Sequence, residues 1–192
     1  IHRLSKEDAT PPPREVRLTL SLPEFAPAGS WRAKLRLRAG SLGQEASREI
    51  PFRILGPEIA PWPSLRVQGL SLRRSKDAPP LPLRLLRAGE TYLLDFVAGG
   101  MRLVPEGGYY HRVRLVCTLR LWDKAGRVVS SQERACELDK RFSFAPLRIR
   151  LSAKWTLPRE TLGSHRLEVE VLDLQSNRVS SLQRSVFLLK PR

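Results

Sequence analysis

The chain has 192 residues, of which 41% are hydrophobic, so it is long enough for one or two folded domains and too apolar for a disordered chain. Its 34 Lys and Arg residues outnumber 19 Asp and Glu residues, and the net charge is +15. This excess either attracts polyanions such as nucleic acid, anionic lipid headgroups or acidic glycan, or reflects in part the codon bias of a GC-rich genome. No apolar run approaches the roughly 18 residues that a membrane span needs, so no transmembrane segment is predicted.

The first 56 residues are predicted to hold a lead-in and a partial β-sandwich unit. Residues 1–14 are polar and include three consecutive prolines, which force extended backbone, so we interpret them as a lead-in or linker. Residues 15–56 contain three predicted strands, 15–22, 31–38 and 45–54. In the second strand four apolar residues alternate with four basic ones, as in a half-buried strand: Trp31, Ala33, Leu35 and Leu37 against Arg32, Lys34, Arg36 and Arg38.

This first unit is expected to be incomplete, because three strands in about 40 residues rarely fold alone. Either further strands precede Ile1 in a longer protein, or a neighbour covers the open face of the unit. The charged first residues do not form a signal peptide, and the chain starts without Met, so a processed form and a fragment are both open.

A proline-rich linker is predicted at residues 57–63, followed by a larger unit at 64–190. Short alternating runs bounded by Gly, Pro and Asp predict strands at 64–72, 91–98, 111–122, 128–136, 146–157, 165–173 and 179–189. The alternation of the first of these slips at Gly69, which predicts a β-bulge there. Helix signals are nearly absent, so the fold class is all-β, as tandem antiparallel β-sandwich units.

The two units share an order of elements. Each has a strand that closes on Leu-Pro, a loop, a Gly-Ser pair at Gly29 or Gly163, an alternating strand, a polar turn and a final strand. The identity between the copies is weak, so the repeat is one of architecture.

A broader resemblance rests on the segment from Gly163 to Asp173 and on Phe187 in the last strand. A glycine that opens a penultimate strand ending in Asp, with an aromatic residue in the final strand, resembles immunoglobulin-like and fibronectin-III-like modules of bacterial extracytoplasmic proteins. The resemblance implies an immunoglobulin-like sandwich, and a resemblance of fold carries no active site with it. The chain lacks the Cys–Trp–Cys spacing of antibody domains, since Trp122 follows Cys117 by only five residues.

The two cysteines, Cys117 and Cys136, flank the predicted turn at residues 123–126. With that turn as the centre of a hairpin, Cys117 faces Gln132 and Cys136 faces Val113, so the two are not directly opposed. A disulfide therefore requires a bulge, a different turn or two facing sheets. The alternative is a pair of buried free thiols.

No catalytic, metal or cofactor motif is present in the sequence. None of His2, His111 and His165 has a second ligand at metal-binding spacing, and Asp173 is the single carboxylate of its turn. There is no Gly-x-Ser-x-Gly, no Cys-x-x-Cys and no phosphate-binding glycine loop before a helix. We therefore expect a protein that is not an enzyme.

The most suggestive constellation is a basic sheet face. Alternation places three arginines of strand 111–122 on one side with Trp122, and two arginines of strand 146–157 on the side opposite its apolar residues. If both strands belong to one sheet, five guanidiniums line its solvent face, where they suit phosphate, sulfate or carboxylate: Arg112, Arg114, Arg120, Arg148 and Arg150. The alternative is an ordinary solvated face whose arginines are spaced by acidic residues of neighbouring strands.

Three functions remain open on the sequence. The leading hypothesis is a structural or protein-interaction module of a bacterial cell-envelope or secreted assembly, with a protein partner or upstream domains of the same polypeptide. The second is a polyanion-binding module that uses the basic face. The third is a carbohydrate-binding accessory domain with a sugar platform drawn from Trp62, Tyr109, Tyr110 and Trp122. A periplasmic or extracellular location is expected, and a cytoplasmic one stays open.

Overall fold

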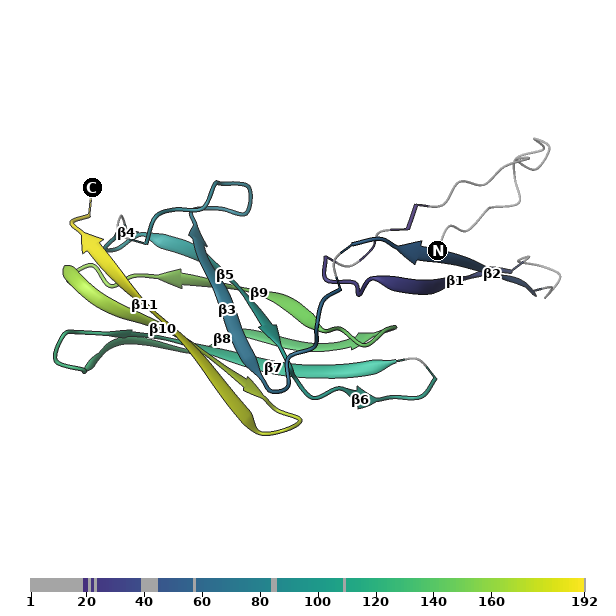
Figure 1. The fold of residues 1–192 in the computed structure, drawn as a ribbon. Helices are drawn as coiled ribbons and strands as arrows, with labels where there is room; N and C mark the ends of the chain where they lie inside the picture. The colour runs from purple at the N-terminus through teal and green to yellow at the C-terminus, as the bar shows by residue number, and fades with distance from the viewer. Residues whose placement is uncertain are drawn as a thin grey trace.

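The computed structural model describes residues 19–20, 22, 24–38, 45–56, 58–83, 86–108 and 110–191 (Figure 1). Throughout these residues the chain forms strands, turns and loops and no helix, so the predicted all-β class is confirmed. The predicted lead-in at 1–14 and most of the predicted strand at 15–22 lie outside the described residues. Residues 19, 20 and 22 are described, and they belong to no strand.

The first unit is an antiparallel hairpin of β1 (Gly29–Arg38) and β2 (Glu45–Ile54). Trp31 lies opposite Phe52 and Leu37 opposite Ala46, so the register is continuous. Both strands agree with the predicted ranges because the alternation of side chains marks a strand locally. In Figure 1 this hairpin extends from one end of the larger unit.

The larger unit contains a three-stranded antiparallel sheet in the order β3 (Arg66–Arg73), β5 (Thr91–Gly99), β9 (Arg148–Thr156). The register between β3 and β5 shifts between Gln68 and Ser71. Gly69 lies inside this shift with a φ of 71°, a conformation that glycine adopts without strain. The predicted bulge at Gly69 is thus confirmed.

A six-stranded sheet faces the first one. Its order is β4 (Leu86–Arg87), β11 (Arg178–Leu189), β10 (Gly163–Asp173), β7 (His111–Trp122) and β6 (Val104–Pro105), and β8 (Val128–Phe142) pairs with the other edge of β7. Only the pairing of β4 with β11 is parallel. Strand β8 runs six residues beyond its predicted end at 136, because it follows β7 along its whole length.

One hydrophobic core fills the space between the two sheets, and all of its buried residues come from residues 65–188. Alternate residues of β5, β7, β9 and β10 point into it, as expected for sheets with one solvated face. None of the described side chains of the β1–β2 hairpin is buried. The hairpin contacts the larger unit through Trp31, whose ring centroid lies 5.6 Å from that of Phe144. Among the described residues, burial is thus confined to 65–188.

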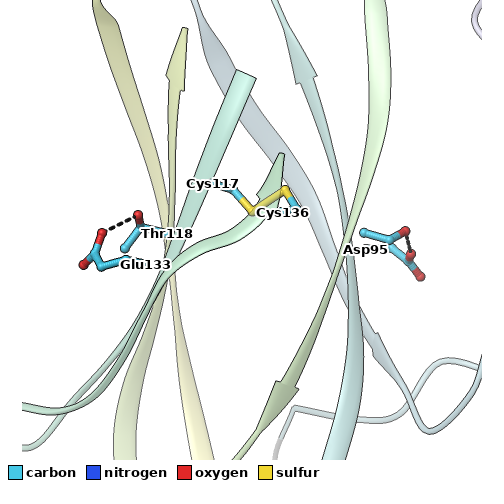
Figure 2. Close-up of a disulfide and its surroundings, with 6 residues drawn as sticks. Asp95, Cys117, Thr118, Glu133 and Cys136 are labelled. Carbon is cyan, nitrogen blue, oxygen red and sulfur yellow. Dashed lines mark hydrogen bonds between the residues drawn. A yellow bond between two sulfur atoms is a disulfide. The ribbon is translucent and has the colours of Figure 1, made fainter. Parts of the chain in front are cut away.

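Cys117 and Cys136 lie directly opposite each other on β7 and β8 and form a disulfide (Figure 2). The expected register was wrong because the hairpin has two irregularities, one beside Trp122 and one between Cys117 and Leu119. At the second, Thr118 alone faces the three residues 133–135, and Arg134 adopts a φ of 51°. This bulge shifts the register so that Cys136 lies opposite Cys117. The two cysteines therefore form a disulfide and are not free thiols.

Candidate interaction surfaces

The structure divides the predicted basic face between two sheets. Arg112, Arg114 and Arg120 lie on β7 in the six-stranded sheet, whereas Arg148 and Arg150 lie on β9 in the three-stranded sheet. The outer faces of two packed sheets point in opposite directions. The five guanidiniums therefore do not line a single surface, and the assumption of one shared sheet was wrong.

At one end of β7, Arg112 and Arg114 converge on the β8 carboxylate that faces them. Arg112 donates to both oxygens of Asp139 at 2.7 and 2.9 Å and to Glu106 at 3.1 Å, and Arg114 lies 3.4 Å from Asp139. The hydrogen bonds from Arg112 lower the pKa of Asp139 below its ordinary value. Both arginines thus already have a carboxylate partner within the protein.

At the other end of β7, Arg120 and Trp122 belong to a cross-strand network on β10. Arg120 donates to both oxygens of Glu170 at 3.0 and 3.1 Å. Trp122 Nε1 donates to Glu168 at 3.0 Å, and Gln183 Nε2 donates to the same carboxylate at 2.8 Å. Burial raises the pKa of Glu168, but these hydrogen bonds and the charge of Arg120 outweigh it, so the pKa lies below its ordinary value.

The outer face of the three-stranded sheet is richer in unpaired basic groups. Residues directly opposite in an antiparallel pair share a face, and Arg66 on β3, Gly99 on β5 and Arg148 on β9 are opposite one another. The same alternation gives the basic residues of this face, which we call the β9 face: Arg66, Arg73, Arg148, Arg150 and Lys154.

Two carboxylates reduce the charge of the β9 face. Asp95 is buried and pairs with Arg73, whose Nε donates at 2.8 Å, and Glu24 pairs with Arg150. Arg66, Arg148 and Lys154 have no carboxylate partner among the described residues. Sequence reasoning missed Arg66, Arg73 and Lys154 as members of a shared surface. Lys154 is an even number of residues from Arg148 and Arg150, so strand alternation alone could have placed it on their face. Arg66 and Arg73 could be assigned to that face only once the order of the strands in the sheet was known.

The aromatic residues considered as a sugar platform do not come together. Tyr110 immediately precedes β7 and Trp122 ends it, so at about 3.3 Å per residue they are roughly 40 Å apart. Each ring also carries a guanidinium: Arg141 lies 4.9 Å from the Tyr110 centroid, and Arg166 lies 5.4 Å from that of Trp122. Trp62 has Arg148 at 4.7 Å and Arg66 at 5.9 Å. Tyr109 lies outside the described residues. Because the rings lie apart and each has a guanidinium over it, they do not favour the carbohydrate-binding hypothesis.

The β1–β2 hairpin presents an apolar face to its surroundings. Opposed residues share this face, and Arg48 is its one charged member: Trp31, Ala33, Leu35, Leu37, Ala46, Arg48, Ile50, Phe52 and Ile54. Leu37 is 55% exposed and Ile50 is 47% exposed, so this apolar face is not buried as the inward faces of the larger unit are. The opposite face is charged, with Arg32 paired to Glu49 at 3.6 Å. No other described strand pairs with either edge of this hairpin.

The described residues contain no cluster of three or more His, Cys, Asp or Glu side chains that could hold a metal ion. They also contain no helix long and apolar enough to cross a membrane. His111 and His165 lie at the starts of different strands, and the Nδ1 of His165 lies 3.1 Å from the carbonyl oxygen of Gly163. The sequence matches no protein-family model and no curated protein.

Proposed function

We propose that this protein is a non-catalytic interaction module whose β1–β2 hairpin binds a protein partner. The observation that carries the proposal is the apolar face of the hairpin. Leu37 and Ile50 are about half exposed there, while every buried hydrophobic residue belongs to the larger unit. Exposed apolar surface of this kind is characteristic of binding sites.

The partner that suits this surface is a β-strand with apolar side chains on one side. Such a strand would extend the two-stranded sheet by main-chain hydrogen bonds at an edge with which no other described strand pairs, and would cover the apolar face with its side chains. A two-stranded sheet is marginally stable by itself, so the partner strand would also stabilise the hairpin. We interpret the larger unit as the rigid support that holds the hairpin in place.

An assembly of the bacterial cell envelope or a secreted assembly is the setting that we propose. The Cys117–Cys136 disulfide supports an oxidising compartment, which means the periplasm or the extracellular space. The immunoglobulin-like resemblance and the order of elements shared by the two units point in the same direction, toward β-sandwich modules in series.

The test is retention of a protein from a lysate of the native organism, washed at low and then high salt, by three baits. The baits are the wild-type chain, the hairpin variant Leu37→Ser/Ile50→Ser, and the control Val128→Ser/Val179→Ser, which changes two exposed valines of the larger unit. We expect one discrete protein that survives high salt, binds the control and is lost from the hairpin variant. Equal retention by the two variants would refute the proposal.

A second candidate, polyanion binding, is favoured by the β9 face rather than by the β7 arginines. Arg66, Arg148 and Lys154 lie there without carboxylate partners among the described residues. Binding of nucleic acid or acidic glycan to this face would weaken steeply with salt. Retention of nucleic acid or glycan that is lost in the high-salt wash, and reduced by Lys154→Gln, would support this function in place of the first.

A further inference from the structure

A cleft of about 540 Å³ lies at the end of the larger unit where β5 and β10 end and β11 begins. Four segments supply its walls: the linker, the residues after β5, the residues before β9 and the β10–β11 turn. The lining residues that matter here are Trp62, Met101, Arg102, Leu147, Ser176 and Arg178. We call it the Trp62 cleft. Its volume is within the range of about 300–1,000 Å³ that small-molecule sites occupy.

The Trp62 wall is built tightly. Trp62 lies over Gly99, in the slot between Arg66 and Arg148, and a Cβ added to Gly99 would come within 2.6 Å of the Trp62 ring. A Cβ added to Gly100 would lie 2.0 Å from the carbonyl oxygen of Ser64. Because only glycine allows this approach, the linker is held closely against the end of the sheet and the cleft is preformed.

The opposite wall is organised by Asp173, which is fully buried. Its Oδ2 accepts from the backbone N–H of Arg102 and from Ser176 Oγ, both at 2.7 Å, and its Oδ1 accepts from the backbone N–H of Gln175 at 3.0 Å. The carboxylate thus joins the segment after β5 to the β10–β11 turn. Since all these bonds are made to backbone or to Ser176, Asp173 does not pair with the guanidiniums of Arg102 or Arg178.

The charge of the Trp62 cleft is positive. No lining residue is acidic, and Arg178 makes no side-chain hydrogen bond or ion pair with the described part of the chain. Among the described residues, the Arg102 guanidinium donates to the backbone oxygen of Gln175 alone, at 3.3 Å. Two polar atoms next to the cleft are buried without any hydrogen-bond partner, Arg148 Nε and Gln175 Oε1. Neither residue lines the cleft, so it is the lining guanidiniums of Arg102 and Arg178 that favour a ligand.

We propose that the Trp62 cleft binds a small ligand that carries a phosphate or carboxylate group on a flat or apolar body. Guanidinium forks recognise either oxyanion with paired hydrogen bonds, and Arg102 and Arg178 line the cleft from two separate segments. Trp62, Met101 and Leu147 supply the apolar surface for the rest of the ligand. This site is independent of the hairpin, so the inference goes beyond the proposed function.

The test is a titration of the isotope-labelled protein followed by amide and Trp indole NMR signals. The probes are phenyl phosphate and benzoate, with phenol as the neutral control, at constant ionic strength. We expect saturable shifts at Arg102, Ser176, Arg178 and the Trp62 indole with at least one anionic probe and none with phenol. The probe that binds more tightly identifies the oxyanion.

Two variants separate the cleft from general basicity. Arg178→Gln should weaken binding of that probe by about tenfold or more, because one fork to the oxyanion is lost. Arg159→Gln, which removes an exposed arginine outside the lining of the cleft, should leave the affinity unchanged. Shifts that do not saturate, equal binding of phenol, or equal losses in the two variants would each overturn the proposal. Both exposed substitutions should leave the NMR spectrum of the folded protein intact elsewhere.

Discussion

The β1–β2 and β7–β8 hairpins contain strands with the same kind of sequence pattern, but their apolar faces are buried to different extents. In β1 and in β7 apolar residues alternate with arginines, and both strands have a long antiparallel partner. The apolar side of β7 is fully buried, its arginines pair with carboxylates of β8 and β10, and a disulfide joins it to β8. In β1–β2 the apolar side remains half exposed. The comparison teaches that alternation specifies an amphipathic strand without specifying what covers it.

The largest difference between the hairpins should come from truncating one apolar residue in each. Leu119→Ala removes a side chain that is 0% exposed, and we expect a loss of about 2–5 kcal/mol in the free energy of unfolding. Leu37→Ala, at 55% exposure, should change it by less than about 0.5 kcal/mol. Urea denaturation measures both. Similar losses in the two variants would mean that the apolar face of β1–β2 is buried after all.

Removing the disulfide should have the next largest effect. The Cys117→Ala/Cys136→Ala variant should lose about 3 kcal/mol, because the crosslink no longer restricts the unfolded chain. Wild-type protein unfolded in the presence of a reducing agent should show most of the same loss. The variant itself should be insensitive to the reducing agent, and a wild type that is equally insensitive would exclude the disulfide in solution.

Neutralising the carboxylate beside Trp122 should cost less. Glu168→Gln leaves an acceptor for Trp122 but removes the charge that attracts Arg120, so we expect a loss of about 1–2 kcal/mol at pH 7. The pKa of Glu168 is lowered by folding, so its stabilisation is complete above the ordinary value of 4.5 and is lost as pH falls through the lowered pKa. The stability of the variant should therefore decline less between pH 5 and lower pH, on the order of 1 kcal/mol. If the stability of the wild type and that of Glu168→Gln fall in parallel as the pH is lowered, the stabilising role given to the Glu168 charge is wrong.

The smallest effect should come from the corresponding ion pair of the other hairpin. Arg32 and Glu49 lie 3.6 Å apart with side chains that are 75% and 51% exposed. A double-mutant cycle of Arg32→Gln and Glu49→Gln should give a coupling below about 0.5 kcal/mol, because water and salt screen exposed pairs. A coupling as large as that between Arg120 and Glu168 would show that β1–β2 is covered in solution.

The interaction surfaces were less predictable than the strands. The assignment of Arg112, Arg114, Arg148 and Arg150 to one surface depended on whether β7 and β9 share a sheet, and strand alternation carries no information about that. Trp62 was singled out as an aromatic residue, but its contact with Gly99 depends on how the linker returns to the end of β5. In the sequence, Asp173 is only the single carboxylate of a polar turn. Its hydrogen bond from Arg102 joins residues that are 71 positions apart, and the local sequence does not indicate that contact.

By itself the sequence determined the all-β class, most strand positions and the bulge at Gly69, because each of these follows from side-chain alternation and glycine conformations within a few neighbouring residues. Tertiary structure alone decided that Cys117 meets Cys136, which sheet each arginine joins, and which apolar faces are buried. These features depend on register shifts and on sheet order between segments that are distant in sequence, and local periodicity is the same whichever pairing the chain adopts.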